Sequence, residues 1–188
     1  MKLRLGRHIA AVIVAACCAL PVSGCGLLGS GQAIAPPPVM TVSSSALVND
    51  VLPVQYTCGA PEAVAKTPPV AWAGQPPGTK SIALVFDDSS APITPYVYWI
   101  VFNIGPQTSD IPEGQLPPGA EQARNSAGSI GYDPPCPGTT AHNYRFTVYA
   151  LNTTLNLPDG TSLQSAWKAI AAAAIPSGRG RATASAIS

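Results

Sequence analysis

The run YVYWIVFNI at residues 96–104 constrains the fold more than any other part of the chain, because it is apolar at odd and even positions alike. Successive side chains of a β-strand point to opposite faces of the sheet, so a strand with this pattern has to be covered on both sides. We therefore expect residues 96–104 to form a central strand. Apolar or alternating runs bounded by turn residues predict further strands at 40–44, 51–57, 81–86 and 144–151, with a weaker candidate at 179–188.

The rest of the chain favours a mainly β fold. Its 188 residues include 21 prolines and 17 glycines, a density of turn formers that argues against a helical bundle. One helix is expected at 163–175, where Thr161–Gln164 fits a capping box, alanines follow, and Pro176 ends the pattern. Trp167 would anchor this helix to the sheet. The predicted fold is an antiparallel β-sandwich with one or two peripheral helices.

The first residues follow the order of an export signal. Three basic residues precede an apolar run of twelve residues at 9–20, which is too short to span a bilayer. The run leads to Val22-Ser23-Gly24-Cys25, where small residues before a cysteine resemble a bacterial lipobox. We predict a lipid on Cys25. The alternative is an ordinary secretory signal with an incidental cysteine.

Cleavage before Cys25 would divide the chain into a signal peptide at 1–24, a flexible tether at 25–38 and a domain at 39–188. The lipid would hold the domain at the cell membrane, on its extracytoplasmic face. Cleavage would leave seven basic and nine acidic residues, a formal charge of −2. Such a balance argues against a nucleic-acid partner, which requires a basic surface.

Two cysteines, Cys58 and Cys136, remain after the signal peptide and the lipidated residue are set aside. An even pair in an exported protein favours a disulfide. The alternative is a reactive thiol, but neither cysteine has a basic neighbour or a CxxC partner. The chain also contains only two histidines, which excludes a histidine-rich metal site. We expect no metal and no cofactor.

Polar residues that could bind a ligand or take part in chemistry occur at the ends of a few predicted strands. His142 and Tyr144 are two residues apart at the start of a predicted strand, so their side chains share one face. Asp87-Asp88 follows another strand, and Tyr96 and Tyr98 share a face of the central one. These residues, with the proline-rich loop 133–138, could converge in a small polar pocket at one rim of the sheet. Taken singly, each is more typical of a structural role.

The segment Ala127–Gly131 (AGSIG) is similar to the turn that carries the nucleophile of serine hydrolases, with alanine in place of the first glycine. His142 is the only base available, no apolar strand leads into the serine and no helical pattern follows it. We therefore expect no catalytic residues and a protein that is not an enzyme.

Five sequence blocks, taken in their order along the chain, resemble the phosphatidylethanolamine-binding protein family. They are SIALVFDD…AP, YVYWIVFNI, LPPGAEQARNSAG, GYDPPCPG and HNYRFTVYAL. The closest likeness is to its bacterial Raf-kinase-inhibitor-like branch, in a lipoprotein form. It runs from about Val51 to the end of the predicted helix. The resemblance implies a large antiparallel sheet packed on a smaller one, with short helices and a small pocket that accepts anions.

The resemblance assigns the pocket residue by residue. The family's DPDAP loop corresponds to residues 88–92, where Asp88 is kept but Ser90 replaces the second acid. Tyr98 stands at the position of a strand histidine, and Asn143 replaces an arginine. The implied ligand-binding residues are Asp88, Tyr98, Pro135, His142 and Tyr144.

This resemblance implies that the protein binds a small anion or a phospholipid headgroup at the rim pocket. An alternative is that the pocket has degenerated and its rim inhibits a protein partner, a protease or a kinase. A kinase target would need a kinase domain outside the membrane, which weighs against that partner.

Overall fold

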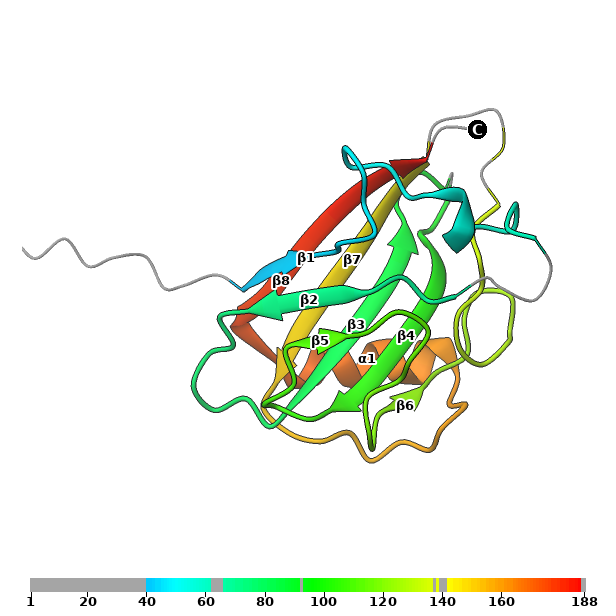
Figure 1. Cartoon of the computed structure of the whole chain (residues 1–188). Coiled ribbons are helices and arrows are strands. Elements are labelled where there is room, and N and C mark those ends of the chain that lie inside the picture. Colours follow the sequence, from blue (N-terminus) through cyan, green and yellow to red (C-terminus); the bar gives the residue numbers. More distant parts are fainter. Residues whose placement is uncertain (1–39, 62–65, 92, 137, 139–141, 187–188) are drawn as a thin grey trace, which may run out of the picture. The chain divides into compact units, whose positions relative to one another are not determined.

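A computed structural model describes residues 40–61, 66–91, 93–136, 138 and 142–186 (Figure 1). The predicted signal peptide, the lipidation site Cys25 and the tether 25–38 lie outside these ranges. Within them, none of the helices has the length and hydropathy that a membrane span requires.

Two antiparallel sheets form the framework of the described chain, which confirms the predicted mainly β sandwich. The larger sheet has the order β6-β4-β3-β7-β8. Its strands are β3 (Ser81–Asp88), β4 (Tyr96–Ile104), β6 (Glu121–Gln122), β7 (His142–Leu151) and β8 (Ala174–Ala186). The smaller sheet has the order β1-β2-β5, with β1 at Thr41–Ser43, β2 at Val70–Ala73 and β5 at Asp110–Ile111.

The large sheet is covered on both faces, as the pattern of residues 96–104 predicts. The small sheet lies over one face and the helix α1 (Leu163–Ala173) lies over the other (Figure 1). Alternate residues of β3 enter two separate cores. Ile82, Leu84 and Phe86 face the small sheet, and Ala83 and Val85 face the helix. Every residue of β3 is buried, so this strand holds the two cores together.

The helix is shorter than predicted and is capped differently. Its N-cap is Ser162, whose side chain accepts a hydrogen bond from the Ser165 amide, so the capping box is not the one expected at Thr161–Gln164. The helix ends at Ala173, because Ala174 is already extended and begins β8. An extended conformation is also favoured just before Pro176.

The prediction that Trp167 anchors the helix is wrong. Its side chain is 47% exposed and contacts Tyr149 edge to face, with ring centroids 6.0 Å apart. The buried residues of α1 are the smaller Ala166, Ile170 and Ala173. A helix lined with alanine can approach the sheet closely, which leaves the bulky indole at the margin.

The strand predicted at 51–57 is also wrong, because the structure has a short 3₁₀ helix, η1 (Val54–Tyr56), preceded by Pro53. Residues 179–186 of the weak candidate at 179–188 belong to β8, which begins earlier than expected and pairs with β7, and residues 187–188 lie outside the described ranges. Gly180 allows β8 to pass beneath the N-terminal strand, since a Cβ atom there would lie 2.5 Å from the Met40 carbonyl oxygen. Strands β2, β5 and β6 have no counterpart in the prediction.

Candidate functional site

An aspartate and a histidine meet where two central strands of the large sheet end. Asp88 is the last residue of β3 and His142 is the first of β7. Asp88 Oδ2 lies 2.6 Å from His142 Nδ1. Asp88 Oδ1 accepts hydrogen bonds from the Ser90 amide at 2.8 Å and the Asn143 amide at 3.3 Å. Both oxygens of a buried carboxylate are therefore engaged, and the imidazole is held in one orientation.

Burial alone raises the pKa of the Asp88 carboxyl, but hydrogen bonds from His142, Ser90 and Asn143 outweigh burial, so the pKa is lowered from its ordinary value. Because the ionised carboxylate only accepts, His142 Nδ1 has to donate to it. The other ring nitrogen, Nε2, is left for a ligand. It is an acceptor when the ring is neutral and a donor when the ring is protonated.

Two tyrosines complete the cluster. The rings of His142 and Tyr144 stack with centroids 5.9 Å apart, which confirms that residues at this spacing share a face. Tyr98 meets Tyr144 edge to face at 5.8 Å. Asp88, Tyr98, His142 and Tyr144 therefore lie together, on the face of the sheet that carries the aromatic core.

The hydroxyl of Tyr144 is buried and, among the described residues, makes no hydrogen bond of regular geometry. Burial is the main cause that raises the pKa of Tyr144 to about 12, with a further rise from the Asp88 charge and a smaller opposing effect of the Tyr98 hydroxyl. Burial also raises the pKa of Tyr98. Both phenols are consequently neutral hydrogen-bond donors at physiological pH.

Further aromatic residues surround this cluster. Tyr96 donates to Asp133 Oδ2 at 2.9 Å, and its ring lies 4.7 Å from that of Tyr98. Tyr132 donates to the Tyr56 carbonyl oxygen at 2.6 Å and stacks on Phe86. Neither Tyr132 nor Phe86 was identified as a site residue from the sequence. In the sequence, only their positions could have indicated a role in the site: Tyr132 directly precedes the 133–138 loop, and Phe86 lies two residues before Asp88.

The described contact of Pro135 is with the segment that carries Cys58, and its predicted contact with a ligand stays a prediction. Pro135 is buried, and its carbonyl oxygen accepts a hydrogen bond from the Cys58 amide at 3.0 Å. The adjacent Cys136 forms a disulfide with Cys58, with Cα atoms 5.1 Å apart. The contacts described for Pro135 thus join its loop to η1, rather than to Asp88 or His142. Residues 137 and 139–141, which link this loop to His142, lie outside the described ranges.

The residues that depart from the family pattern support the turn after β3. Ser90 Oγ accepts a hydrogen bond from the Asn143 amide at 2.9 Å. The Ser89 amide donates to the Asn143 carbonyl oxygen at 3.0 Å. Ser90 therefore keeps an acceptor at this position without the charge of the missing acid.

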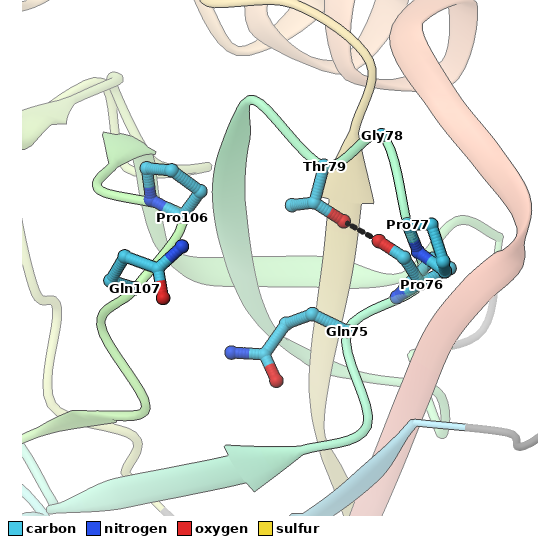
Figure 2. A pocket seen from close by; sticks show the side chains of 7 residues that line it. All are labelled: Gln75, Pro76, Pro77, Gly78, Thr79, Pro106 and Gln107. Atoms are coloured by element: carbon cyan, nitrogen blue, oxygen red, sulfur yellow. Dashed lines mark hydrogen bonds between the residues drawn. The ribbon is translucent and has the colours of Figure 1, made fainter.

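A cavity of about 320 Å³ lies at the end of the large sheet opposite to Asp88 and His142, between the loops after β2 and β4 (Figure 2). It is lined by amide and proline side chains, and its Thr79 hydroxyl is bonded to the Pro76 carbonyl oxygen at 2.6 Å. No residue predicted as a ligand contact lines it. In the described part of the chain, no cluster of three His, Cys, Asp or Glu side chains could hold a metal ion.

The described geometry can be compared with known proteins. A family model described as phosphatidylethanolamine-binding protein matches residues 42–183. The UPF0098 protein PH1269 of Pyrococcus horikoshii is 38% identical over 161 residues, which cover 80% of this chain and 77% of the relative. A Mycobacterium tuberculosis protein, provisionally named lipoprotein LppC, is 42% identical over 125 residues, which cover 65% of this chain and 60% of that protein.

Two solved structures are similar to the described fold. Escherichia coli YbcL, described as a new member of the mammalian PEBP family, superposes with a TM-score of 0.71 and is 25% identical. The match covers 80% of this chain and 99% of YbcL. CT736 of Chlamydia trachomatis, provisionally described as a PEBP homologue, gives a TM-score of 0.68 at 29% identity, over 78% of this chain and 96% of that one.

Proposed function

Since the chain belongs to the phosphatidylethanolamine-binding protein family, we propose that it binds a small phosphate-bearing headgroup at the rim cluster of Asp88, Tyr98, His142 and Tyr144. We further propose that it does so as a lipid-anchored protein on the extracytoplasmic face of the cell membrane. The lipobox-like sequence before Cys25 and the lipoprotein name of one relative support the anchor.

The observation that carries the proposal is the buried pair of Asp88 and His142. With the imidazole protonated, the pair is neutral overall and Nε2 donates a hydrogen bond outwards. With the imidazole neutral, the pair carries the negative charge of Asp88 and Nε2 has no proton to donate. An anion is therefore attracted in the first state and repelled in the second.

The tyrosines would supply further donors. The buried hydroxyl of Tyr144 has no regular partner in the described structure, which is costly unless a ligand or water accepts its proton in a hydrogen bond. A phosphate oxygen is a strong acceptor and fits that need. Tyr98 lies beside Tyr144 and could donate to the same group.

The neighbouring Asp133 favours a zwitterionic headgroup over a plain phosphate. Its carboxylate accepts from Tyr96, whose ring packs on Tyr98. A carboxylate next to aromatic rings suits an ammonium group. Phosphoethanolamine carries both charges, so we expect it to bind more tightly than inorganic phosphate does.

We predict that phosphoethanolamine binding to the full chain depends on pH through His142. The pKa of Asp88 is lowered, so its carboxylate stays ionised at neutral and mildly acidic pH. Histidine is the side chain type that ordinarily changes charge between about pH 5 and 8. Affinity should fall about tenfold or more as pH rises across that interval, because a charge-assisted hydrogen bond is lost. Isothermal titration calorimetry at several pH values measures this change.

The control for this experiment is His142→Ala, titrated over the same pH range. Phosphate monoesters change their own charge near pH 6, and the variant records that contribution alone. The variant should bind weakly at low pH and show a flat or much shallower profile. A variant that keeps the wild-type affinity and profile would contradict the proposed site.

We predict that Tyr98→His strengthens phosphoethanolamine binding by about three- to tenfold at pH 6, because a second protonated imidazole adds a charged donor. Calorimetry at pH 6 and pH 8 checks the change, which should shrink at the higher pH. Tyr149→His is the matched control, since Tyr149 packs in the core on the helix side of the sheet. If both variants leave the affinity unchanged, our account of the site's specificity is wrong.

A further inference from the structure

A further cavity lies on the other face of the large sheet, beneath the start of α1. Its volume is about 570 Å³, within the range of small-molecule sites. Its floor is formed by Val85, Val97 and Ile100, and Leu163 and Trp167 of the helix form one wall. None of the rim cluster of Asp88, Tyr98, His142 and Tyr144 lines it.

Strand alternation separates the two sites. Asp88 points to His142 on the small-sheet face, whereas Asp87 points to the helix face, where it is bonded to Arg145. The Arg145 Nε donates to Asp87 Oδ1 at 2.9 Å and a guanidinium nitrogen donates to Oδ2. This bidentate pair is partly buried at the margin of the cavity and leaves little net charge there.

Two more arginines reach the same cavity from β8. Arg179 pairs in register with Tyr149 of β7, and Arg181 with Thr147, so the two arginines are two residues apart and share the helix face. Arg181 Nε donates to the Thr147 hydroxyl at 3.1 Å. Within the described ranges, neither guanidinium forms an ion pair with a carboxylate.

The positive potential of the cavity is thus not neutralised by its own lining, because Asp87 is the only acidic residue among the lining residues. Burial raises the pKa of the Tyr149 phenol, and the charges of Arg179 and Arg181 oppose that rise, so both guanidiniums lie within electrostatic reach of the cavity interior. The N-terminal turn of α1 contributes Leu163 and Gln164 to the lining and contains no acidic residue. Its dipole adds to the positive potential.

We propose that this helix-side cavity binds a small organic monoanion, with its carboxylate at Arg179 and Arg181 and its apolar body on the floor of Val85, Val97 and Ile100 beside Trp167. The apolar floor disfavours a bare inorganic anion, and the two unpaired guanidiniums disfavour a neutral molecule. The half-exposed indole of Trp167 would be covered by the bound body.

Titrations of the full chain with 4-phenylbutyrate and with its neutral analogue 4-phenylbutanamide test the proposal. The acid should bind with one site per chain and about tenfold more tightly than the amide, or better, because only the acid makes charge-assisted hydrogen bonds. Equal affinity for the two compounds, or no binding of the acid, overturns the proposal.

The double variant Arg179→Gln/Arg181→Gln should lower the affinity for the acid to that of the amide and leave the affinity for the amide unchanged. The control is Lys66→Gln/Lys80→Gln, which removes the same charge from two exposed residues that do not line the cavity. This control should bind the acid as the wild type does. An equal loss in both double variants would mean that net charge, rather than the cavity, attracts the acid.

Two further readouts locate the site. In a ¹H–¹⁵N NMR spectrum, the acid should shift the indole signal of Trp167 and leave those of Trp72 and Trp99 in place. His142→Ala should leave acid binding unchanged, because His142 lies on the other face of the sheet. Loss of acid binding in that variant, or shifts confined to Trp72 and Trp99, would place the acid elsewhere and overturn the proposal.

Discussion

Replacing Cys58 and Cys136 by serine is expected to lower the free energy of unfolding by about 4–5 kcal/mol in the chain-entropy model. The disulfide joins residues 78 positions apart, so it removes a large loop-closure entropy from the unfolded chain. For a domain of this size, the midpoint of thermal unfolding should fall by about 10–15 °C. The bridge also joins two segments outside the sheets, the one just after η1 and the loop that contains Pro135.

Thermal unfolding followed by circular dichroism, with and without a reductant, measures the effect. Reduction of the wild type should reproduce the midpoint of the double serine variant, and reductant should leave the variant itself unchanged. If the oxidised wild type and the variant unfold at the same temperature, the disulfide contributes no stability. Thiol labelling of the denatured, unreduced protein should in addition find Cys58 and Cys136 unreactive.

Phe86→Ala is expected to lower the free energy of unfolding by about 3–5 kcal/mol, the usual cost of truncating a buried aromatic residue. Phe86 is fully buried and stacks on Phe146 with ring centroids 4.3 Å apart. Its ring also contacts Tyr98, Tyr132 and Tyr144 at centroid distances of 5.5–5.9 Å. The resulting cavity would lie directly behind the rim cluster. Phosphoethanolamine affinity should therefore fall together with stability.

Phe102→Ala is the matched control, because Phe102 is fully buried in the core on the helix side of the sheet. It should destabilise the protein by a similar amount, as measured by urea unfolding at an unchanged m-value. Its affinity for phosphoethanolamine should stay near that of the wild type at temperatures well below the midpoint. Equal losses of affinity in both variants would show that Phe86 has no particular role behind the rim cluster.

The elements that could be predicted are those whose pattern of apolar and polar residues is compatible with only one type of secondary structure. Residues 96–104 are apolar on both faces, and β4 has the predicted bounds. The run 51–57 is also partly apolar, but its pairing with β8 is limited to a bridge between Val51 and Ser185, and a short 3₁₀ turn follows Pro53. β2 was missed because Val70–Ala73 is too short to show alternation clearly, although its residues are alternately buried and exposed.

Within the candidate site, the sequence spacing of two residues predicts a shared face only when both residues lie on the same strand. The common face of His142 and Tyr144 follows from their separation, and their stacked rings agree with it. Tyr132 reaches the cluster from a loop, for which no periodicity exists. The helix-side cavity could not be predicted either, since it requires knowing that β8 returns beside β7 and brings Arg179 and Arg181 to the face where Asp87 holds Arg145.

The alternation of Asp87 and Asp88 makes β3 more sensitive to a change in length than to replacement of either aspartate. Each aspartate can be replaced with consequences for one face only. A single inserted or deleted residue within the strand, however, would exchange the faces of all residues beyond it. An insertion would move Asp87 into the place of Asp88, facing His142, and a deletion would move Asp88 into the place of Asp87, facing Arg145. It would also direct the side chains of one core into the other. Relatives that diverge in β3 should therefore differ by replacements and not by gaps, with length changes confined to the turn after Asp88.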